Sequence, residues 1–543
     1  MMKTYRHIIA FFVVVTLLFS ACSKDSLDLS NPNQPVPANL KTPDGLKKIG
    51  FGIFYQLYYT YWWWWAGGDL NCMADLVTIS VGNYNWRWAN QTTSITLSNG
   101  TVITPPDVGT QPELLKTKND RTIGNDNTFL HEWRSMYLVI GQANYILEIV
   151  DDAEVSDAFK NTMKAWAYWW KGLSYSRIGS LYEVGLIVDT YNETNNSYVS
   201  YTAILSEAAA SFDKSLTLLN AMPAAGNSDY NDVMDYLIPN ESKAGRGGVP
   251  TPAEWARAIN TYKARNILAN KYAKDLTSAD LLAMKALADN GLQATDKIFT
   301  IRHASINSLV GGTPAWTPGR VMSMSWERIS ERFVQDFKQG DKRKDRNMKE
   351  MVPSKWMVNP SSRGFQYGSR WEPIAAETGG GEWFSQSPNA VEIPLACTYE
   401  ENLLILAECA IRSDDIETGL GYIDDVRTHQ NAGLAAVKGT GLTKDQALEE
   451  LRRERRVGLF QNYVGFYDAR RWEVIKDVSQ GGGRTGAVVV LGQNYPGFPG
   501  GVDYNATINY NYLERFDVPA GEIELNPMTS MPSGGSAVNE GAK

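Results

Sequence analysis

Histidine and cysteine are scarce in this chain of 543 residues, which has four of each. Their positions do not have the short spacings that metal sites require. A phosphate-binding P-loop and the G-x-S-x-G motif of serine hydrolases are also missing. The sequence therefore predicts no metal site, no cofactor and no familiar catalytic centre.

Long apolar runs are missing too. An apolar stretch at Ile8–Phe19 follows Lys3 and Arg6, and its twelve residues are too few for a transmembrane helix, which needs about 20. The sequence "LFSAC" at Leu18–Cys22 resembles a bacterial lipoprotein box; the alternative is an ordinary signal peptide that a cysteine happens to follow. We expect residues 1–21 to be a signal peptide, 22–43 a lipidated N-terminus and extended tether, and 44–543 one domain.

Positive charge is in deficit, with 52 Lys+Arg against 60 Asp+Glu and a formal net charge of −8. Removing residues 1–21 with their two basic residues leaves −10. A mildly acidic chain with interspersed charges is poorly suited to bind nucleic acid. If Cys22 carries the lipid, Cys72, Cys397 and Cys409 remain, and we expect these to be buried free thiols.

Helical periodicity dominates the rest of the chain. Thr42-Pro43-Asp44 is a typical helix start, and Thr443 with Gln446 forms a predicted capping box. The expected helical ranges are 128–151, 155–181, 202–220, 252–275, 278–295, 398–411, 414–429, 443–458 and 461–476. Long stretches at 78–127, 221–250, 300–325, 350–395 and 478–517 look irregular and are rich in aromatic residues, including Trp356 and Trp371.

Three short matches to functional motifs have plainer interpretations. "GGGRTG" at Gly481–Gly486 follows a helix and precedes a strand-like segment, the reverse of the order that phosphate binding requires. Ser211 and Lys214 form S-x-x-K in mid-helix without partner motifs. In "ELRRERR" at 450–456 the glutamates alternate with arginines, which predicts an exposed salt-bridged face.

Three blocks in the C-terminal third resemble the SusD/RagB family of outer-membrane lipoproteins. They are "ENLLILAECAIRSDDIETGLGYIDDVRTHQNAG", "LRRERRVGLFQNYVGFYDARRW" and "FDVPAGEIELNP". The matching residues are Ala407, Glu408, Arg427, Ala432, Gly433, Glu454, Arg455, Arg456, Asp468, Arg471, Trp472, Pro519, Glu522, Asn526 and Pro527.

This resemblance implies an all-α fold, a SusD-like superhelix of tetratricopeptide-like helix pairs with a loop-rich ligand-binding half. The spacing of Tyr168, Gly172 and Tyr175 also resembles part of a tetratricopeptide repeat. The resemblance further implies a non-catalytic lipoprotein on the surface of the outer membrane. Such a protein captures oligosaccharides and acts as a lid over a SusC-like TonB-dependent transporter.

Four consecutive tryptophans, Trp62–Trp65, raise the question of core or ligand platform. Successive residues of a helix point about 100° apart, so the four side chains radiate to every side. A helix that is apolar all round is normally buried. We therefore expect core, with at most one tryptophan, nearest Gly67-Gly68, at the border of a site.

In the resembled family the aromatic residues that stack on ligands come from a loop after the first helix and from a middle segment. Here these correspond to 82–91 and 311–320. The expected ligand-binding residues are Tyr84, Asn85, Trp86, Trp88, Trp316 and Arg320. In an extended strand Tyr84, Trp86 and Trp88 share one face, and a half-buried strand is the structural alternative.

Three other functions stay open at the level of sequence. The first is a peptide-binding lid of a similar transporter, and the second is a helical adaptor without a small ligand. The third is a secreted hydrolase with an unrecognised acid pair, because 60 acidic residues make some close pair inevitable.

Overall fold

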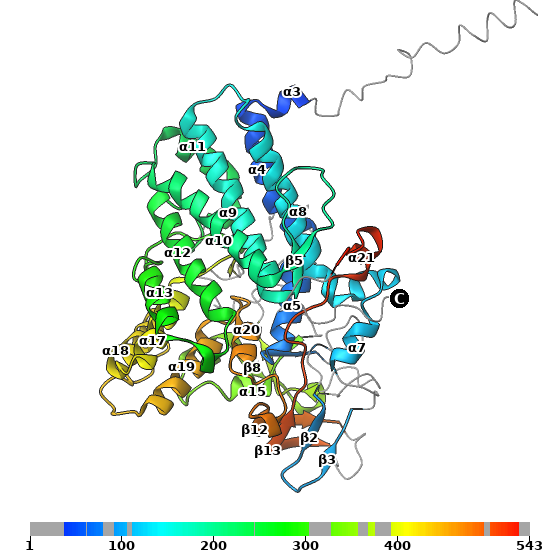
Figure 1. The fold of residues 1–543 in the computed structure, drawn as a ribbon. Coiled ribbons are helices and arrows are strands. Elements are labelled where there is room, and N and C mark those ends of the chain that lie inside the picture. Colours follow the sequence, from blue (N-terminus) through cyan, green and yellow to red (C-terminus); the bar gives the residue numbers. More distant parts are fainter. Residues whose placement is uncertain are drawn as a thin grey trace, which may run out of the picture.

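The computed structural model describes residues 37–60, 62–79, 89, 92–105, 111–243, 245–302, 327–356, 367–374, 392–492 and 500–530. Most of them are helical, and the long helices lie together on one side of the molecule while β2, β3, β12 and β13 lie at the opposite end (Figure 1). None of the helices in these ranges is both long and apolar enough to cross a membrane.

Twelve of the helices that the structure describes pack into the helical part or beside it. They are α4 (Pro43–Tyr59), α5 (Trp62–Met73), α8 (Thr128–Ile149), α9 (Asp157–Leu181), α10 (Tyr201–Asn220), α11 (Ser228–Leu237), α12 (Pro252–Ala269), α13 (Ser278–Ala288), α17 (Tyr399–Arg412), α18 (Ile416–His429), α19 (Lys444–Gly458) and α20 (Gly465–Arg471). Shorter ones are α3 (Pro37–Leu40), α7 (Gln111–Thr117), α15 (Glu331–Val334), α16 (Lys342–Asn347) and α21 (Ala520–Leu525). The 3-10 turns are η1 (Arg121–Asp126), η2 (Asn240–Ser242), η3 (Ala273–Asp275), η6 (Pro353–Lys355) and η8 (Val478–Gln480).

Local sequence signals account for most of these helices. Every range expected to be helical contains a helix, although 278–295 ends early at Ala288 and 461–476 is helical only over Gly465–Arg471. The capping box at Thr443 is present, since its hydroxyl accepts from the Gln446 amide and the Gln446 side chain accepts in return. Helix α11 lies within 221–250, which we expected to be irregular.

The expectation of an all-α fold was incomplete, because short strands form four sheets. The strands are β1 (Val77–Ile79), β2 (Ser94–Thr96), β3 (Val102–Ile103), β4 (Val184–Leu186), β5 (Tyr198–Ser200), β6 (Thr300–Arg302), β7 (Glu327–Ile329), β8 (Met348–Glu350), β9 (Tyr367–Gly368), β10 (Trp371–Pro373), β11 (Glu392–Pro394), β12 (Arg484–Leu491) and β13 (Gly501–Asn509).

The two larger sheets are built from residues far apart in the sequence. One has the order β3-β2-β13-β12-β9 and the other β1-β7-β10-β8. The neighbours pair antiparallel, as Ile95 of β2 does with Ile508 of β13. Most of these strands have two or three residues, too few to show a two-residue period, so the sequence pattern did not reveal them. The longer β12 overlaps the segment after Gly486 that looked strand-like in the sequence, whereas β13 was not expected.

Aromatic side chains fill the centre of the helical part. Trp166, Trp169 and Trp170 of α9 are fully buried, and Trp166 and Trp169 pack edge-on against Trp255 of α12. At Gly172 of α9 a Cβ atom would lie 2.5 Å from the ring of Phe212 in α10, so glycine permits the close approach of these helices.

Of the four consecutive tryptophans, the structure describes the side chain of Trp62 alone, and this side chain lies in the core as expected. It is 1% exposed, and its Nε1 donates to both carboxylate oxygens of Glu132 at 3.1 Å. Arg177, which pairs with the same glutamate, lies 4.6 Å from the indole centroid. The side chains of residues 63–65 lie outside the described part of the structure.

The free thiols are buried as expected, at Cys72, Cys397 and Cys409. The prediction for "ELRRERR" was only half right, because its charges are paired but Glu454, Arg455 and Arg456 are 2–4% exposed. They are buried because α19 packs against α17 and α18. Their partners, also buried, are Arg343 and Arg427 for Glu454, Asp468 for Arg455, and Asp336 for Arg456.

Candidate ligand-binding site

The residues expected to bind a ligand lie outside the described ranges. This holds for Tyr84, Asn85, Trp86, Trp88, Trp316 and Arg320, and also for the expected lipidation site Cys22. The structure does describe the strands on either side of the segments that carry these residues. The strand pairing therefore tells where those segments join the fold.

The two predicted ligand segments join the four-stranded sheet side by side. Strand β1 ends at Ile79, which pairs with Glu327, the first residue of β7. The stretch that contains Trp86 begins at residue 80, directly after Ile79. The stretch that contains Trp316 ends at residue 326, directly before Glu327. Strand β10 runs antiparallel to β7, and its first residue, Trp371, pairs with Ile329. The last residue of β10, Pro373, therefore lies at the same end of the sheet as Glu327.

The pairing of β6 with β11 brings together one end of the stretch 303–326 and one end of the stretch 375–391. Strand β6 ends at Arg302, which pairs with Glu392 at the start of β11. Both stretches therefore connect the same two places, the β6–β11 pair and one end of the β1-β7-β10-β8 sheet. We call this end of the sheet, where Ile79, Glu327 and Pro373 lie, the sheet end.

Two described tryptophans lie towards the opposite end of the same sheet, where Trp371 pairs with Ile329 and Glu350, and one of them contacts a positive charge. Trp371 is partly buried, and the Lys344 ammonium of α16 lies 4.0 Å from the centroid of its ring. Trp356 is also partly buried, and its Nε1 donates to the Met351 carbonyl at 2.9 Å. Cation–π contacts of this kind orient an aromatic ring and are worth about 0.5–1 kcal/mol at exposed sites.

One exposed aromatic residue on the five-stranded sheet is held in a similar way. Tyr504 of β13 is 63% exposed, and the Arg370 guanidinium lies 5.3 Å from its ring centroid. Arg370 in turn pairs with the buried Glu331 at 2.9 Å. Neither Tyr504 nor Arg370 is expected as a site residue from the sequence, because an isolated tyrosine in an expected loop carries no such signal.

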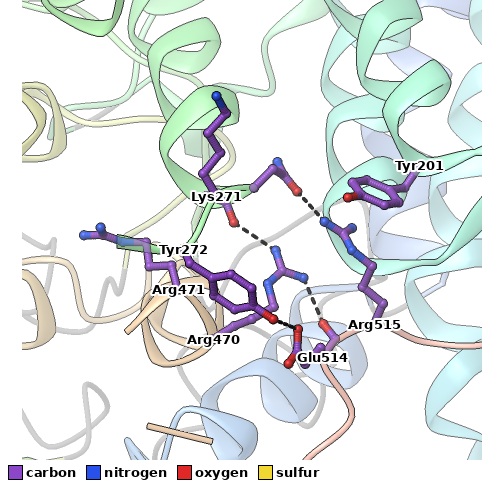
Figure 2. Close-up of a pocket in the computed structure, with 9 residues that line it drawn as sticks. Tyr201, Lys271, Tyr272, Arg470, Arg471, Glu514 and Arg515 are labelled. Carbon is purple, nitrogen blue, oxygen red and sulfur yellow. Dashed lines mark hydrogen bonds between the residues drawn. The ribbon is translucent and has the colours of Figure 1, made fainter. Parts of the chain in front are cut away.

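A small polar pocket lies between the ends of two helices and the C-terminal segment (Figure 2). It has a volume of about 90 Å³, and Arg470 and Arg515 both line it. Arg515 stacks on Tyr201, with 3.6 Å from its guanidinium carbon to the ring centroid. The Tyr272 hydroxyl donates to the Glu514 carboxylate.

Three arginines line this pocket; Arg471 pairs with Glu408 and Asp468, whereas Arg470 and Arg515 bind backbone rather than carboxylates. Arg470 donates to the carbonyls of Ser180, Ala269 and Glu514 at 2.8–2.9 Å, and Arg515 donates to that of Gly179 at 2.7 Å. Ser180, Gly179 and Ala269 belong to the last turns of α9 and α12, where the helix dipole is negative.

The electrostatics of Arg470 reflect this arrangement. Burial first, and then the neighbouring Arg515, lowers the pKa of Arg470 to about 9. The two cations thus tie helix ends to the segment around residue 515, and their donors are directed at those ends rather than at the pocket. This explains the pocket as a structural junction, so the sheet end is the stronger candidate for ligand binding.

The comparisons with known proteins agree with this architecture. Residues 399–530 match the model of the SusD family, and this range contains the three blocks that carried the resemblance. This part of the chain therefore belongs to the SusD/RagB family. A comparison with curated proteins gave no match.

Solved structures show the SusD-like fold over most of the chain. A SusD superfamily protein from Bacteroides vulgatus has a TM-score of 0.54 at 13% identity and covers 91% of this chain and 99% of its own. One from Bacteroides thetaiotaomicron has 0.53 at 15% and covers 90% and 98%. A third structure, solved with xylogluco-oligosaccharide, has 0.51 at 14% and covers 91% and 100%.

Proposed function

We propose that this SusD-like protein captures oligosaccharides at the cell surface. In this proposal it acts as a lid that delivers them to a SusC-like TonB-dependent transporter in the outer membrane. The observation that carries the proposal is the match of residues 399–530 to the SusD family. A structure of the same fold solved with xylogluco-oligosaccharide supports a sugar as the ligand.

The ligand residues that we propose are those named from the sequence: Tyr84, Asn85, Trp86, Trp88, Trp316 and Arg320. The pairing of Ile79 with Glu327 supports this set, since it joins both segments to the fold at the sheet end. Sugars present C–H faces to aromatic rings, while their hydroxyl groups need a few polar partners. Asn85 and Arg320 would supply such partners.

The remaining parts of the proposal concern the anchor and the helices. Lipid on Cys22 would hold the protein at the outer membrane, with residues 22–43 as a tether. We further infer that neighbouring helices such as α9 with α10 and α17 with α18, which pack against each other, are tetratricopeptide-like pairs. The protein is not an enzyme in this proposal, so purified protein should release no new reducing ends from a bound glycan.

Isothermal titration with a panel of oligosaccharides that includes xyloglucan fragments tests the ligand site. Trp86→Ala and Trp316→Ala should each weaken binding by roughly 5- to 150-fold, the equivalent of about 1–3 kcal/mol of lost contact. Their melting temperatures should stay close to that of the wild type. Tyr236→Ala is the matched control, because Tyr236 is an aromatic residue of α11 that is 37% exposed in the helical part.

Other outcomes would redirect the proposal in distinct ways. Binding of peptides but of no sugar in the panel would assign the protein to peptide capture. Cleavage of the sugar by pure protein would favour a hydrolase. If Trp86→Ala and Trp316→Ala melt early and still bind normally, these tryptophans belong to the core and the assignment of the site is wrong.

A further inference from the structure

A second pocket, separate from the residues proposed above, lies where β12 begins. It has a volume of about 380 Å³ and is lined by α19, by residues at and after α15, and by the glycine-rich turn Gly481–Gly486. Four arginines line it: Arg332, Arg452, Arg453 and Arg484. We call it the arginine pocket. The sequence match "GGGRTG", which failed as a nucleotide loop, thus supplies part of its wall.

The charges around the arginine pocket do not balance. Its lining has two acids, Asp336 and Glu449, against the four arginines, which leaves two positive charges in excess. Directly behind it, Asp75 pairs with Arg332 and Arg456 pairs with Asp336. Asp75 and Arg456 are buried and add one negative and one positive charge, so the excess stays at two positive charges.

Two of the four arginines, Arg332 and Arg452, have most of their donors bound within the fold. Arg332 donates to both carboxylate oxygens of Asp75 at 2.7 and 2.9 Å and to the Val488 carbonyl at 3.2 Å. Arg452 binds Glu449 through two donors at 2.7 and 2.8 Å. These contacts fix the walls of the pocket and leave little donor capacity on either side chain.

Arg484 is the exception. Its side chain is 12% exposed, and its one ionic contact is 3.5 Å from Nε to the Asp75 carboxylate. Within the part of the chain that the structure describes, its guanidinium makes no hydrogen bond, although Nε is buried. A buried Nε without a hydrogen bond costs free energy, because this donor has lost water without replacement.

The positive charge of Arg484 affects its neighbours. The pKa of Arg456 lies below its ordinary value because of burial first and Arg484 second, despite the nearby Asp336. An anion in the arginine pocket would offset this repulsion and satisfy the donors of Arg484. Guanidinium groups bind oxyanions through two parallel N–H···O bonds, so this is the chemistry that the lining recognises.

We propose that the arginine pocket binds an oxyanion carried by a small ligand, namely the carboxylate or sulfate of an acidic sugar. Its volume lies within the usual range of about 300–1,000 Å³ for ligand sites and leaves room for a sugar ring beside the anionic group. This goes beyond the capture of neutral oligosaccharide at the sheet end and uses different residues. Either site can therefore be lost without the other.

Isothermal titration of the full-length protein with galacturonate trisaccharide, glucose 6-sulfate and inorganic phosphate tests the proposal. At least one of the two acidic sugars should bind, with an affinity that falls as NaCl rises because salt screens the charges, and phosphate shows whether an anion without a sugar ring is enough. Arg484→Met keeps the apolar stem and removes the donors, and it should weaken that binding tenfold or more. Arg121→Met is the control, because this arginine is 59% exposed and its acid partner Glu524 lies 3.7 Å away.

A second variant keeps the test valid if Arg484→Met fails to fold. Thr485 lines the pocket and is exposed, so Thr485→Glu adds an acid at the pocket without disturbing the core, and it should also weaken anion binding tenfold. Neutral oligosaccharide binding should be unchanged in both variants. A preference for galacturonate, sulfate or phosphate would identify the anion that the pocket takes.

Two results would overturn the proposal. One is that neither acidic sugar binds the wild type, whether or not phosphate does. The other is that Arg484→Met and Thr485→Glu bind the anion as tightly as Arg121→Met does. Loss of neutral glycan binding alone, with anion binding intact, would instead count against the proposed function and leave the arginine pocket standing.

Discussion

A buried ion cluster at the junction of α17 and α20 offers a sharp test of how the fold is held together. Arg471 is 1% exposed and donates to both carboxylate oxygens of the fully buried Glu408 at 2.8 and 2.6 Å. Its Nε donates to Asp468 at 2.7 Å, and the same carboxylate accepts from Arg455 at 2.9 Å. Arg471→Met would remove the central cation and keep most of its volume.

The magnitude follows from what the substitution leaves behind. Glu408 would keep only Arg412, whose Nε lies 2.8 Å away and whose side chain is 18% exposed. Breaking a buried ion pair by removing one partner costs about 3–5 kcal/mol. The entropy of unfolding is roughly 1 kcal/mol per kelvin for a chain of about 500 residues, so the melting temperature should fall by about 3–5 °C.

The same cluster predicts how that difference varies with pH. Burial alone would raise the pKa of Glu408, but the charge and hydrogen bonds of Arg471 overcome this and lower it from 4.5 to about 2. Because the pKa is lower in the folded state, the stabilisation is complete above about pH 4.5 and is lost as the pH falls towards 2. A shift of this size corresponds to about 3 kcal/mol, in agreement with the cost of the lost pair.

Differential scanning calorimetry of the wild type and Arg471→Met between pH 3 and 7 measures both effects. The two melting temperatures should differ most above pH 5, and the difference should shrink from pH 4.5 to pH 3, where the unfolded chain takes up a proton at Glu408 while the folded wild type keeps this group ionised. The control is Arg453→Met, since Arg453 pairs with Glu449 at 2.9 Å with its side chain 39% exposed, and it should change the melting temperature by less than about 1 °C. Equal melting of Arg471→Met and Arg453→Met at pH 7 would refute the reasoning.

Three further substitutions test the core, the helix packing and the anchor. Trp62→Ala should cost about 3–5 kcal/mol of stability in calorimetry through the cavity that it leaves, and unchanged melting would remove Trp62 from the core. Gly172→Ala should lower the melting temperature, because its Cβ would lie 2.5 Å from the ring of Phe212. The control Gly141→Ala should be neutral or stabilising, because no atom lies within 4 Å of its new Cβ. If Gly141→Ala lowered the melting temperature more than Gly172→Ala, the packing of α9 on α10 would be contradicted. Cys22→Ser should move the protein from membrane to soluble fractions in cell fractionation, and equal membrane recovery would argue against the lipid anchor.

The helices were predictable because their signals are local. The periodicity of α8 and α9, the proline at the start of α4 and the capping box of α19 each lie within a few residues of the helix that they specify. The sheets were not predictable, because β13 needs β2 about 400 residues earlier to form its ladder. The burial of Glu454 was missed for the same reason, since its partner Arg343 is distant in sequence.

The same contrast applied to the candidate sites. Tryptophans in expected loops indicated where a ligand would be bound, but the pairing of Ile79 with Glu327, which joins two such segments at the sheet end, appears only in the fold. Arg484 differs in that its local motif was noticed before its role was. Its glycine-rich motif was noticed, yet the chemistry depends on Asp75 and the arginines of α19, which no spacing around Gly481–Gly486 reveals.

The residues that identified the family are themselves evidence about where ligand specificity resides. Arg427 pairs with Glu454, Arg455 with Asp468, and Arg471 with Glu408, and all six are 4% exposed or less. Buried in this way, they hold α17 to α20 together and cannot touch a sugar. The family pattern therefore describes the scaffold, and in our two proposals the choice of ligand comes from other residues, at the sheet end and around Arg484.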